Sequence, residues 1–565
     1  MASQLSIGFP LHLPKSVYQY GERSSGEIHG VVLTKEHIVN MILDISGYRA
    51  SEDLSSKNFL EPSCGHGAFI VPAIHRFFES LGSKAFDTEF LKDRFLAYDI
   101  DEEHVDITRK AVQRALVENG IHTSTASFLS ESWIRCGDFL LECENRNFDF
   151  VVGNPPYIRI EQLSPKLQAE YRSRFSSLYD RADIYVAFIE SGLDKLSSNG
   201  NLTFICADRW ILNKYGAPLR EKVTKEFGIR YYIDLHEASP FDSEVIAYPA
   251  VFTIARQKCE TVHVATLHTA TPDECRTVTA RLLQGKGTSN GVDIHKYTTW
   301  FTGSEPWVLG SPEHLRVLRE LEDRFLPLES HGDTRVGIGV ATGNDKVYIV
   351  DSAADVEPDR LVPLVKREDI VDGKILDAGR SVVNTFTQGN GTVNLDEYPK
   401  LKAFFEKHEE LVKKRHVAKK NPGSWFRTID RVYPELVKKP KLLIPDIAGS
   451  NEVAFDEGKY HPHHNLYYIV STNWDLEVLG GLLSSKVALF FIWSYAVKMR
   501  GEYLRFQAQY IRRICVPKPD VISEGIQRGI KDAFRNRDFQ ALDTLALKAY
   551  NLTTLPHFDF VDTRK

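Results

Sequence analysis

Short apolar runs alternate with amphipathic stretches from about residue 30 to residue 255. Runs rich in β-branched and aromatic residues are typical of buried strands in a parallel sheet, and apolar residues at intervals of three and four are typical of helices. The helical pattern is clearest at 105–118 and 184–196, and strands are expected at 59–61, 95–99, 148–152, 202–207, 231–235 and 251–255. This order predicts an α/β domain with a doubly wound sheet.

The pattern changes in the second half of the chain. It weakens between residues 256 and 325, where "QGKGTSNGVD" at 284–293 has the composition of a linker, and the remaining residues do not repeat the alternation. A chain of 565 residues is also too long for one ordinary domain. We therefore expect an amino-terminal arm at 1–29, the α/β domain at 30–257, a connecting region at 258–325 and an α+β domain at 326–565.

Composition and charge narrow the class of protein only slightly. A hydrophobic fraction of 42% and a charged fraction of 26% are those of a soluble globular protein. The formal net charge of -6 does not by itself indicate a polyanionic partner. Residues 400–441, however, hold 13 Lys and Arg against five acids. This excess is compatible with solvated helix faces and with a nucleic-acid-binding face.

Cysteine spacing and hydropathy bear on the compartment and on metals. The seven cysteines are scattered, without the short spacings of zinc or redox motifs, so no metal is expected and a cytoplasmic location is favoured. The amino terminus lacks the features of a secretory signal. The most apolar stretch, 478–497, carries Lys486 at its centre, which predicts a buried helix and no membrane span.

A glycine-bearing turn follows the first expected strand. In "FLEPSCGHGAFIVPAI" at 59–74, Gly65 and Gly67 separate the strand from an apolar helix, so bare backbone and a helix amino terminus face a ligand. Ile70 occupies the place of the third glycine that dinucleotide-binding turns require, which disfavours a pyrophosphate ligand. Alone, this motif fits an ordinary turn equally well.

Acidic residues end the next two segments. Asp99 closes an expected strand, where a carboxylate can accept both hydroxyls of a ribose. Asp138 and Phe139 follow, a pair suited to bonding an adenine amino group and covering its ring. Any one of these acids is more often a cap or turn residue. Together with the glycine turn they predict a pocket for a nucleoside without phosphate.

The expected strand at 148–152 leads into "NPPY", residues 154–157, which predicts a rigid polar tip at the ligand-binding edge of the sheet. With this motif in place the chain resembles the gamma-class, TaqI-type, S-adenosylmethionine-dependent DNA adenine-N6 methyltransferases of restriction–modification systems, from about Gly30 to Pro519. The resemblance implies a Rossmann-like class I methyltransferase domain with a mixed, mostly parallel sheet, followed by a target-recognition domain.

The resemblance also assigns the cofactor site. S-adenosylmethionine is the implied cofactor, and Thr34 is expected at its methionine part, although Lys35 stands where the family usually has proline. The other cofactor-binding residues it implies are Glu61, Pro62, Cys64, Gly65 and Gly67 at the methionine end, Asp99 and Ile100 at ribose and adenine, Asp138 and Phe139 at adenine, and Asn154. Phe188 or Tyr185 is expected near the cofactor.

"NPPY" matches the family's catalytic motif in every letter. The Asn154 side-chain oxygen and the Pro155 carbonyl are suited to accept hydrogen bonds from the two N6 hydrogens of adenine, with Pro156 stiffening the backbone. Tyr157 and Phe241 are expected to stack on a base that has left the duplex. Phe241 also fits a core position in a hairpin.

The carboxy-terminal half resembles the recognition domain more loosely, through segments 335–350 and 498–519. Lys346, Arg500, Tyr503 and Arg505 are the expected DNA-binding residues there. The implied partner is double-stranded DNA, with a restriction endonuclease as a genetic rather than physical companion. A monomer in a bacterial or archaeal cytoplasm, without membrane contact, is expected.

Several alternatives remain open at this stage. A cytosine-N4 enzyme shares the chemistry, although such enzymes more often carry serine in place of Asn154. RNA and protein amine methyltransferases resemble only the α/β part of the chain. A non-catalytic DNA-binding subunit is disfavoured by the intact 154–157 motif. A fused nuclease would need a further cluster of acids and a lysine, which the sequence does not show.

Overall fold

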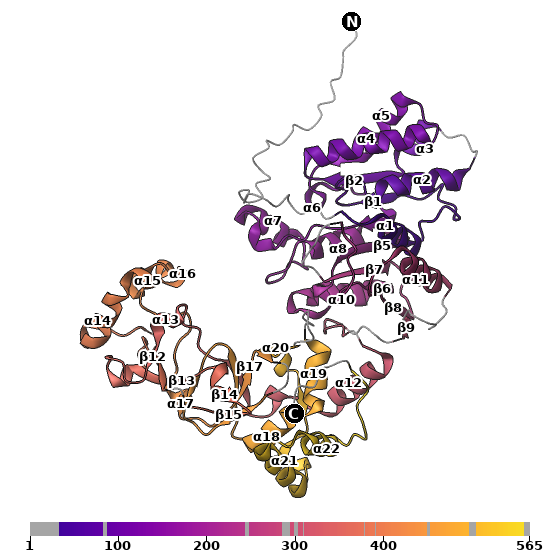
Figure 1. Cartoon of the computed structure of the whole chain (residues 1–565). Coiled ribbons are helices and arrows are strands. Elements are labelled where there is room, and N and C mark those ends of the chain that lie inside the picture. Colours follow the sequence, from indigo (N-terminus) through magenta and orange to yellow (C-terminus); the bar gives the residue numbers. More distant parts are fainter. Residues whose placement is uncertain are drawn as a thin grey trace. The chain divides into compact units, whose positions relative to one another are not determined.

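The computed structural model describes residues 33–82, 87–242, 248–284, 294–298, 303–308, 310–377, 379–389, 391–448, 452–496 and 504–558. The chain divides into two compact units, Met1–Val308 and Leu309–Lys565. Figure 1 shows the first in indigo to magenta and the second in orange to yellow.

Unit 1 is built on a nine-stranded sheet with the order β3-β2-β1-β4-β5-β7-β6-β8-β9. Strands β3, β2, β1, β4 and β5 are parallel, and β7 runs antiparallel between β5 and β6. This confirms the mixed, mostly parallel sheet that the sequence predicts. The first seven strands are β1 (Phe59–Glu61), β2 (Phe95–Asp99), β3 (Ile134–Cys136), β4 (Phe148–Gly153), β5 (Leu196–Ala207), β6 (Gly228–Asp234) and β7 (Pro249–Ala255).

Helices cover both faces of this sheet (Figure 1). One face shares a core with α1 (Glu36–Ser46), α2 (Ile70–Leu81), α3 (Thr88–Lys92), α4 (Glu102–Glu118), α5 (Thr123–Trp133) and α11 (Pro272–Gln284). On the other face Gly192 of α8 (Tyr185–Asp194) lies so close to Leu202 and Val151 that an added Cβ would come within 2.7 Å of Leu202. The remaining helices of this unit are α6 (Phe139–Glu142), α7 (Pro165–Arg174), α9 (Arg209–Leu212) and α10 (Ala217–Glu226).

The structure differs from the connecting region expected at 258–325. Strands β8 (Val262–Thr266) and β9 (Ile294–Tyr297) continue the sheet beyond β6, and α11 packs on α1. The units divide at Val308 and Leu309. β8 has five residues and the edge strand β9 has four, and polar residues interrupt both, so their apolar signal is too short for the sequence pattern to predict them.

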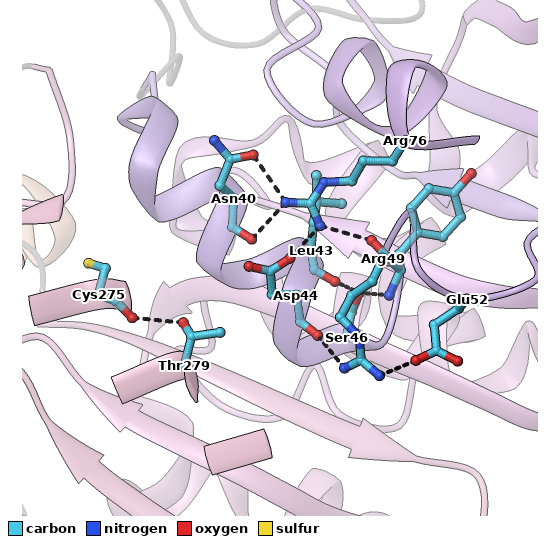
Figure 2. A network of polar contacts seen from close by, with 10 residues as sticks. Asn40, Leu43, Asp44, Ser46, Arg49, Glu52, Arg76, Cys275 and Thr279 are labelled. Atoms are coloured by element: carbon cyan, nitrogen blue, oxygen red, sulfur yellow. Dashed lines mark hydrogen bonds and ion pairs between the residues drawn. The ribbon is translucent and has the colours of Figure 1, made fainter. Parts of the chain in front are cut away.

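A polar network joins α1 and the residues that follow it to α2 (Figure 2). The Arg76 guanidinium of α2 donates to Asp44 Oδ1 at 2.7 Å, to the Tyr48 carbonyl at 2.9 Å, and to both oxygens of Asn40. Arg49 donates to the Asp44 carbonyl and to Glu52. Because Arg is planar with five donors, one side chain can join the last turns of α1 to α2.

Unit 2 combines two four-stranded sheets with helices. The sheet orders are β11-β21-β17-β19 and β12-β16-β13-β20. Its strands are β10 (Leu326–Pro327), β11 (Arg335–Ile338), β12 (Ile349–Asp351), β13 (Leu361–Val365), β14 (Ile370–Val371), β15 (Lys374–Ile375), β16 (Arg380–Val383), β17 (Lys441–Pro445), β18 (Ile447–Ala448), β19 (Ala454–Asp456), β20 (His461–Pro462), β21 (Leu466–Val470), β22 (Leu504–Arg505) and β23 (Cys515–Val516). Its helices are α12 (Pro312–Arg324), α13 (Asp345–Tyr348), α14 (Pro399–Lys407), α15 (Glu409–Lys413), α16 (His416–Lys420), α17 (Pro434–Val437), α18 (Leu476–Leu483), α19 (Lys486–Tyr495), α20 (Ala508–Ile511), α21 (Glu524–Asn536) and α22 (Phe539–Ala549).

The apolar stretch at 478–497 forms two buried helices, α18 and α19, instead of one. Ser484 and Ser485 break it, and each hydroxyl donates to a carbonyl of the preceding turn. In the described part of the chain no single helix is long and apolar enough to cross a membrane. Helices α18 and α19 are long and apolar enough for a membrane span only when they are taken together, and their axes are bent by 59°.

Replacing Arg76 by Ala should lower the free energy of unfolding by about 1–3 kcal/mol, because it removes one ion pair and leaves partly buried carbonyls unbonded. Urea denaturation followed by circular dichroism measures this loss. Arg114→Ala, at an exposed position of α4, is the matched control and should change stability by less than about 0.5 kcal/mol. Equal unfolding midpoints for the two variants would contradict the role given to Arg76.

Candidate active site

A cavity of about 290 Å³ lies at the carboxyl ends of β1, β2 and β4. Parallel strands deliver their terminal residues to one edge of a sheet, which is where ligands bind in such folds. Most residues expected from the sequence line this cavity: Thr34, Glu61, Pro62, Cys64, Gly65, Asp99, Ile100, Asp138, Phe139, Asn154 and Pro156. Gly67, Pro155, Tyr157 and Phe241 are not among the lining residues.

Glu61 anchors the turn at the end of β1. Its side chain is 1% exposed and accepts a hydrogen bond from the Ile70 amide, at the start of α2, at 2.8 Å. Burial raises the pKa of this carboxyl well above its usual value, against the effect of the backbone donors. A buried carboxylate of this kind is stabilised by a ligand that brings positive charge.

The glycine turn has the conformation that the sequence indicates. Gly65 and Gly67 have φ angles of 49° and 86°, which side-chain-bearing residues rarely adopt. A Cβ on Gly67 would also lie 3.2 Å from Thr108 of α4. Gly67 therefore shapes the turn from behind the cavity, without lining it.

Asp99 closes the turn from β2. Its Oδ2 accepts from the Gly65 amide at 2.9 Å, and its Oδ1 accepts from the Asp101 amide at 3.0 Å. His104 Nδ1 lies 3.3 Å from the same Oδ1, and this hydrogen bond raises the pKa of His104. Oδ1 therefore has two protein partners, whereas Oδ2 has one and keeps acceptor capacity for a further donor, such as a ribose hydroxyl.

Asp138 and Phe139 lie at the start of α6. Asp138 is 2% exposed, accepts from the Leu140 amide at 2.9 Å, and accepts from the Tyr171 hydroxyl at 2.5 Å. Burial raises the pKa of Asp138 to about 6. Phe139 packs against Phe188 of α8 with ring centroids 5.4 Å apart. This end of the cavity offers an acceptor beside aromatic surface, as a purine requires.

The 154–157 tip is held from two sides. Ser63 Oγ donates to the Asn154 carbonyl at 2.9 Å, and Asn154 Nδ2 lies 3.4 Å from Thr34 Oγ1. An amide whose Nδ2 faces Thr34 turns its Oδ1 in the other direction. The tip is thereby oriented both by Ser63 of the glycine turn and by Thr34 before α1.

Backbone pairing brings Phe241 to the tip. Thr34 and Phe241 form an antiparallel bridge, with the Asp242 amide donating to the Leu33 carbonyl at 3.0 Å. The rings of Tyr157 and Phe241 meet edge to face, with centroids 6.3 Å apart and planes at 67°. The two predicted stacking residues are thus neighbours. A base could enter between them only if one ring turned.

The sequence did not single out several lining residues. The ring centroids of His66 and His104 lie 5.1 Å apart beside Asp99, and Ile158 and Ile184 add apolar surface. Of the two aromatics expected near the cofactor, Phe188 lines the cavity, whereas Tyr185 is buried and bonds Tyr215 instead. Tyr171 was also missed. It belongs to α7, which has no clear apolar face, and it lies 33 residues beyond its hydrogen-bond partner Asp138 in the sequence.

The residues expected to bind DNA are only partly described. Lys346 is exposed on α13, and the backbone of Arg505 pairs with Ile447. Arg500 and Tyr503 lie outside the described residues. In the basic stretch, two cations have structural roles: Lys441 pairs with Asp456 inside the core, and Arg415 bonds the Thr342 carbonyl and other groups. The DNA-binding assignments stay predictions.

One group in unit 2 resembles a metal site. Asp345, His463 and His464 place possible ligand atoms within 4.8 Å of one another. His463 Nε2 lies 2.9 Å from Asp345 Oδ2, and Lys366 Nζ lies 3.9 Å from the same oxygen. A lysine beside the carboxylate supplies positive charge already, so this group is better described as an ion-paired network.

Comparison with known proteins agrees with this geometry. A sequence profile described as Eco57I restriction-modification methylase matches residues 93–241, and a TaqI-like C-terminal specificity domain matches 401–516. The sheet order, its antiparallel strand and the cavity define a class I methyltransferase fold, followed by a specificity domain.

The chain belongs to the type II methyltransferases of restriction–modification systems. Type II methyltransferase M.BstVI of Geobacillus stearothermophilus is 41% identical over 544 residues, covering 94% of this chain and 97% of the relative. M.PaeR7I of Pseudomonas aeruginosa is 41% identical over 533 residues, covering 93% and 92%. The DNA complex of the type IIL enzyme MmeI shares the fold, with TM-score 0.60, 14% identity, and coverage of 93% of this chain and 73% of that one.

Glu61→Gln should raise the stability of the protein without cofactor at pH 8 by about 1–3 kcal/mol, because it removes a buried charge and keeps an acceptor for the Ile70 amide. The pKa of Glu61 is raised in the folded state, so the wild-type carboxylate becomes protonated as pH falls through that pKa. Its buried charge, and the destabilisation that this charge causes, are then lost. The gain should therefore shrink towards pH 5. Thermal unfolding at both pH values measures it.

Glu89→Gln, at a side chain 83% exposed, is the control and should leave stability unchanged at either pH. A Glu61→Gln protein less stable than the wild type at pH 8 would show that the carboxylate is well solvated or paired.

Proposed function

We propose that this enzyme transfers a methyl group from S-adenosylmethionine to N6 of an adenine that has been flipped out of duplex DNA. The observation that carries the proposal is the juxtaposition of Asn154 and the cofactor-type cavity, with Tyr157 and Phe241 in ring contact beside it. Membership among type II methyltransferases supports DNA as the substrate, and protection from a cognate restriction endonuclease as the biological role.

The cavity residues fit the cofactor by their chemistry. Asp138 and Phe139 would hold adenine, Asp99 would accept ribose hydroxyls, and Glu61 would face the positively charged methionine end. The cofactor supplies an electrophilic methyl group on a sulfonium. Buried carboxylates at both ends of the cavity suit a ligand that carries an amino group and a positive charge.

The tip residues would activate the target nitrogen. The exocyclic amine of adenine is a poor nucleophile because its lone pair is delocalised into the ring. Asn154 Oδ1 and the Pro155 carbonyl would accept hydrogen bonds from its two N–H groups and favour tetrahedral geometry at nitrogen. The N–CH3 bond would form as the S–CH3 bond breaks, and the nitrogen would then lose one proton to solvent. Two adjacent prolines restrict φ, so the carbonyl keeps its direction without loss of entropy at binding. No covalent enzyme intermediate is required.

Tyr157 and Phe241 would hold the flipped base. In a duplex the amine is paired and out of reach, so the base must leave the stack. Two aromatic rings replace the lost stacking on both faces. The edge-to-face contact between them then describes a slot that opens when a base arrives.

Cytosine-N4 methylation is the second candidate, because the same pair of acceptors serves any exocyclic amine on a planar ring. Asn154 in place of serine favours adenine.

Asn154→Ala should lower the rate of methyl transfer by about 100-fold or more, because it removes one of two acceptors that act at the transition state. Plasmid DNA incubated with cofactor and enzyme, then digested to nucleosides, gives N6-methyladenine directly. Cofactor affinity is measured in parallel by calorimetry, since Asn154 also lines the cavity. N6-methyladenine formed at the wild-type rate would refute the mechanism, and N4-methylcytosine would establish the second candidate.

Phe241→Ala should weaken capture of the flipped base by about 1–3 kcal/mol through loss of stacking. The measurement is methylation of a duplex containing the recognition sequence, which sequencing of methylated plasmid would provide. A mismatched target pair, which costs less to open, should restore part of the rate. Phe241→Tyr keeps the ring and serves as the control. Phe241 is already buried in the core of unit 1, at 6% exposure, so no recovery with the mismatch would leave it with a packing role alone.

A further inference from the structure

The segment that follows the catalytic tip reaches back to the far end of the cofactor cavity. After Tyr157 the chain runs through α7 before α8 begins. From α7 the Tyr171 side chain, 1% exposed, extends its hydroxyl to Asp138 Oδ2 at 2.5 Å. A buried tyrosine hydroxyl on a buried carboxylate is the closest polar contact that this segment makes with the cavity lining.

Two protein donors hold the Asp138 carboxylate in its ionised form. The Leu140 amide donates to Oδ1 and Tyr171 to Oδ2, and both lower a pKa that burial raises. The negative charges of Glu142 in α6 and Glu170 in α7 have the opposite effect and raise the pKa of Asp138. Arg174 of α7 bonds the Leu141 carbonyl close by, and the other titratable groups of the lining are Glu61, Cys64, His66, Asp99, Asp101 and His104.

The geometry leaves Asp138 able to accept a ligand donor. Each carboxylate oxygen has two lone-pair sites and takes one protein donor, so acceptor capacity remains on both. A hydroxyl that donates to Oδ2 also fixes the rotation of the carboxylate plane. An acceptor fixed in this way loses no conformational entropy when an amine binds.

We propose that Tyr171 is a positioning residue of the cofactor site, which orients and keeps ionised the Asp138 carboxylate for an adenine amino group and thereby ties segment 158–182 to the cofactor. This inference rests on the proposed function, since it takes the adenine of S-adenosylmethionine as the ligand at Asp138. It adds a residue outside the strand-end motifs and links the catalytic tip to the adenine end through one hydrogen bond.

The consequence is a pH dependence of cofactor binding that Tyr171 sets. The carboxylate form of Asp138 accepts the amine, so affinity falls as pH drops through the pKa of this group, about 6 in the free enzyme. Without the hydroxyl the pKa rises further, and the fall begins at higher pH. A residue that merely packed in the core would change stability and leave the midpoint unmoved.

The test is isothermal titration of S-adenosylmethionine into the full-length wild type and Tyr171→Phe between pH 5 and pH 8. Wild-type affinity should fall about tenfold from pH 7.5 to pH 5. The midpoint for Tyr171→Phe should lie roughly one pH unit higher, since the lost hydrogen bond served the charged form. Asp99 raises the pKa of His104, but this group is common to both proteins.

Tyr179→Phe, the same change at an exposed site of the same segment, is the control and should follow the wild-type curve. Hydrogen exchange gives a second readout: cofactor should slow exchange over 165–174 in the wild type and less in Tyr171→Phe. Should Tyr171→Phe fail to fold, Asp138→Asn serves instead and should show a smaller acid fall in affinity than the wild type, since only Glu61 and His104 still titrate as before. Coincident curves for wild type and Tyr171→Phe, or an unchanged acid fall in Asp138→Asn, would overturn the inference. A wild type that binds no cofactor at any pH would overturn the proposed function instead.

Discussion

The turn between β1 and α2 depends on two carboxylates that bond its backbone. Glu61 accepts from the Ile70 amide, and Asp99 accepts from the Gly65 amide across from the neighbouring strand. Together they hold a loop whose glycines adopt positive φ, and they do so with groups that also line the cavity. The same side chains thus shape the site and give it its charge. A substitution at either position alters geometry and electrostatics together.

From this turn the rest of the site is connected in a short series of contacts. Ser63 in the turn bonds the Asn154 carbonyl, Asn154 approaches Thr34, and Thr34 pairs through its backbone with Phe241. Four segments far apart in sequence therefore meet at the tip. Because each contact involves backbone on at least one side or a short side chain, a shift in the turn is transmitted to Tyr157 and Phe241. Under the proposed function, this arrangement supplies the preorganisation that transfer to a weak nucleophile demands.

Strand ends were predictable from the sequence, and side-chain partnerships mostly were not. Asp99 and Asn154 follow apolar runs, so their place at one edge follows from strand order alone. Asp138 was expected at a further strand end, but the bounds of β3 were not predicted, because Arg135 and Cys136 are exposed and leave one buried residue as a signal. Tyr171 carries no local mark of its role, since its partner is fixed only by the packing of α7. The basic stretch at 400–441 shows the same limit of the sequence. Its composition counts Lys441 as a surface charge, whereas the fold buries this side chain against Asp456.

The electrostatic character of the cavity gives a reason for its selectivity. Glu61 and Asp138 both have raised pKa values because burial removes their hydration, and their hydrogen bonds only partly offset this cost. Such groups are least stable as bare anions and gain most from a donor or a cation. Under the proposed function, the thioether product would keep the α-ammonium group of the cofactor but lose its sulfonium charge, and Glu61 would then have less positive charge beside it. Burial of these carboxylates therefore favours the sulfonium form of the cofactor over its thioether product, and it lowers the stability of the empty protein.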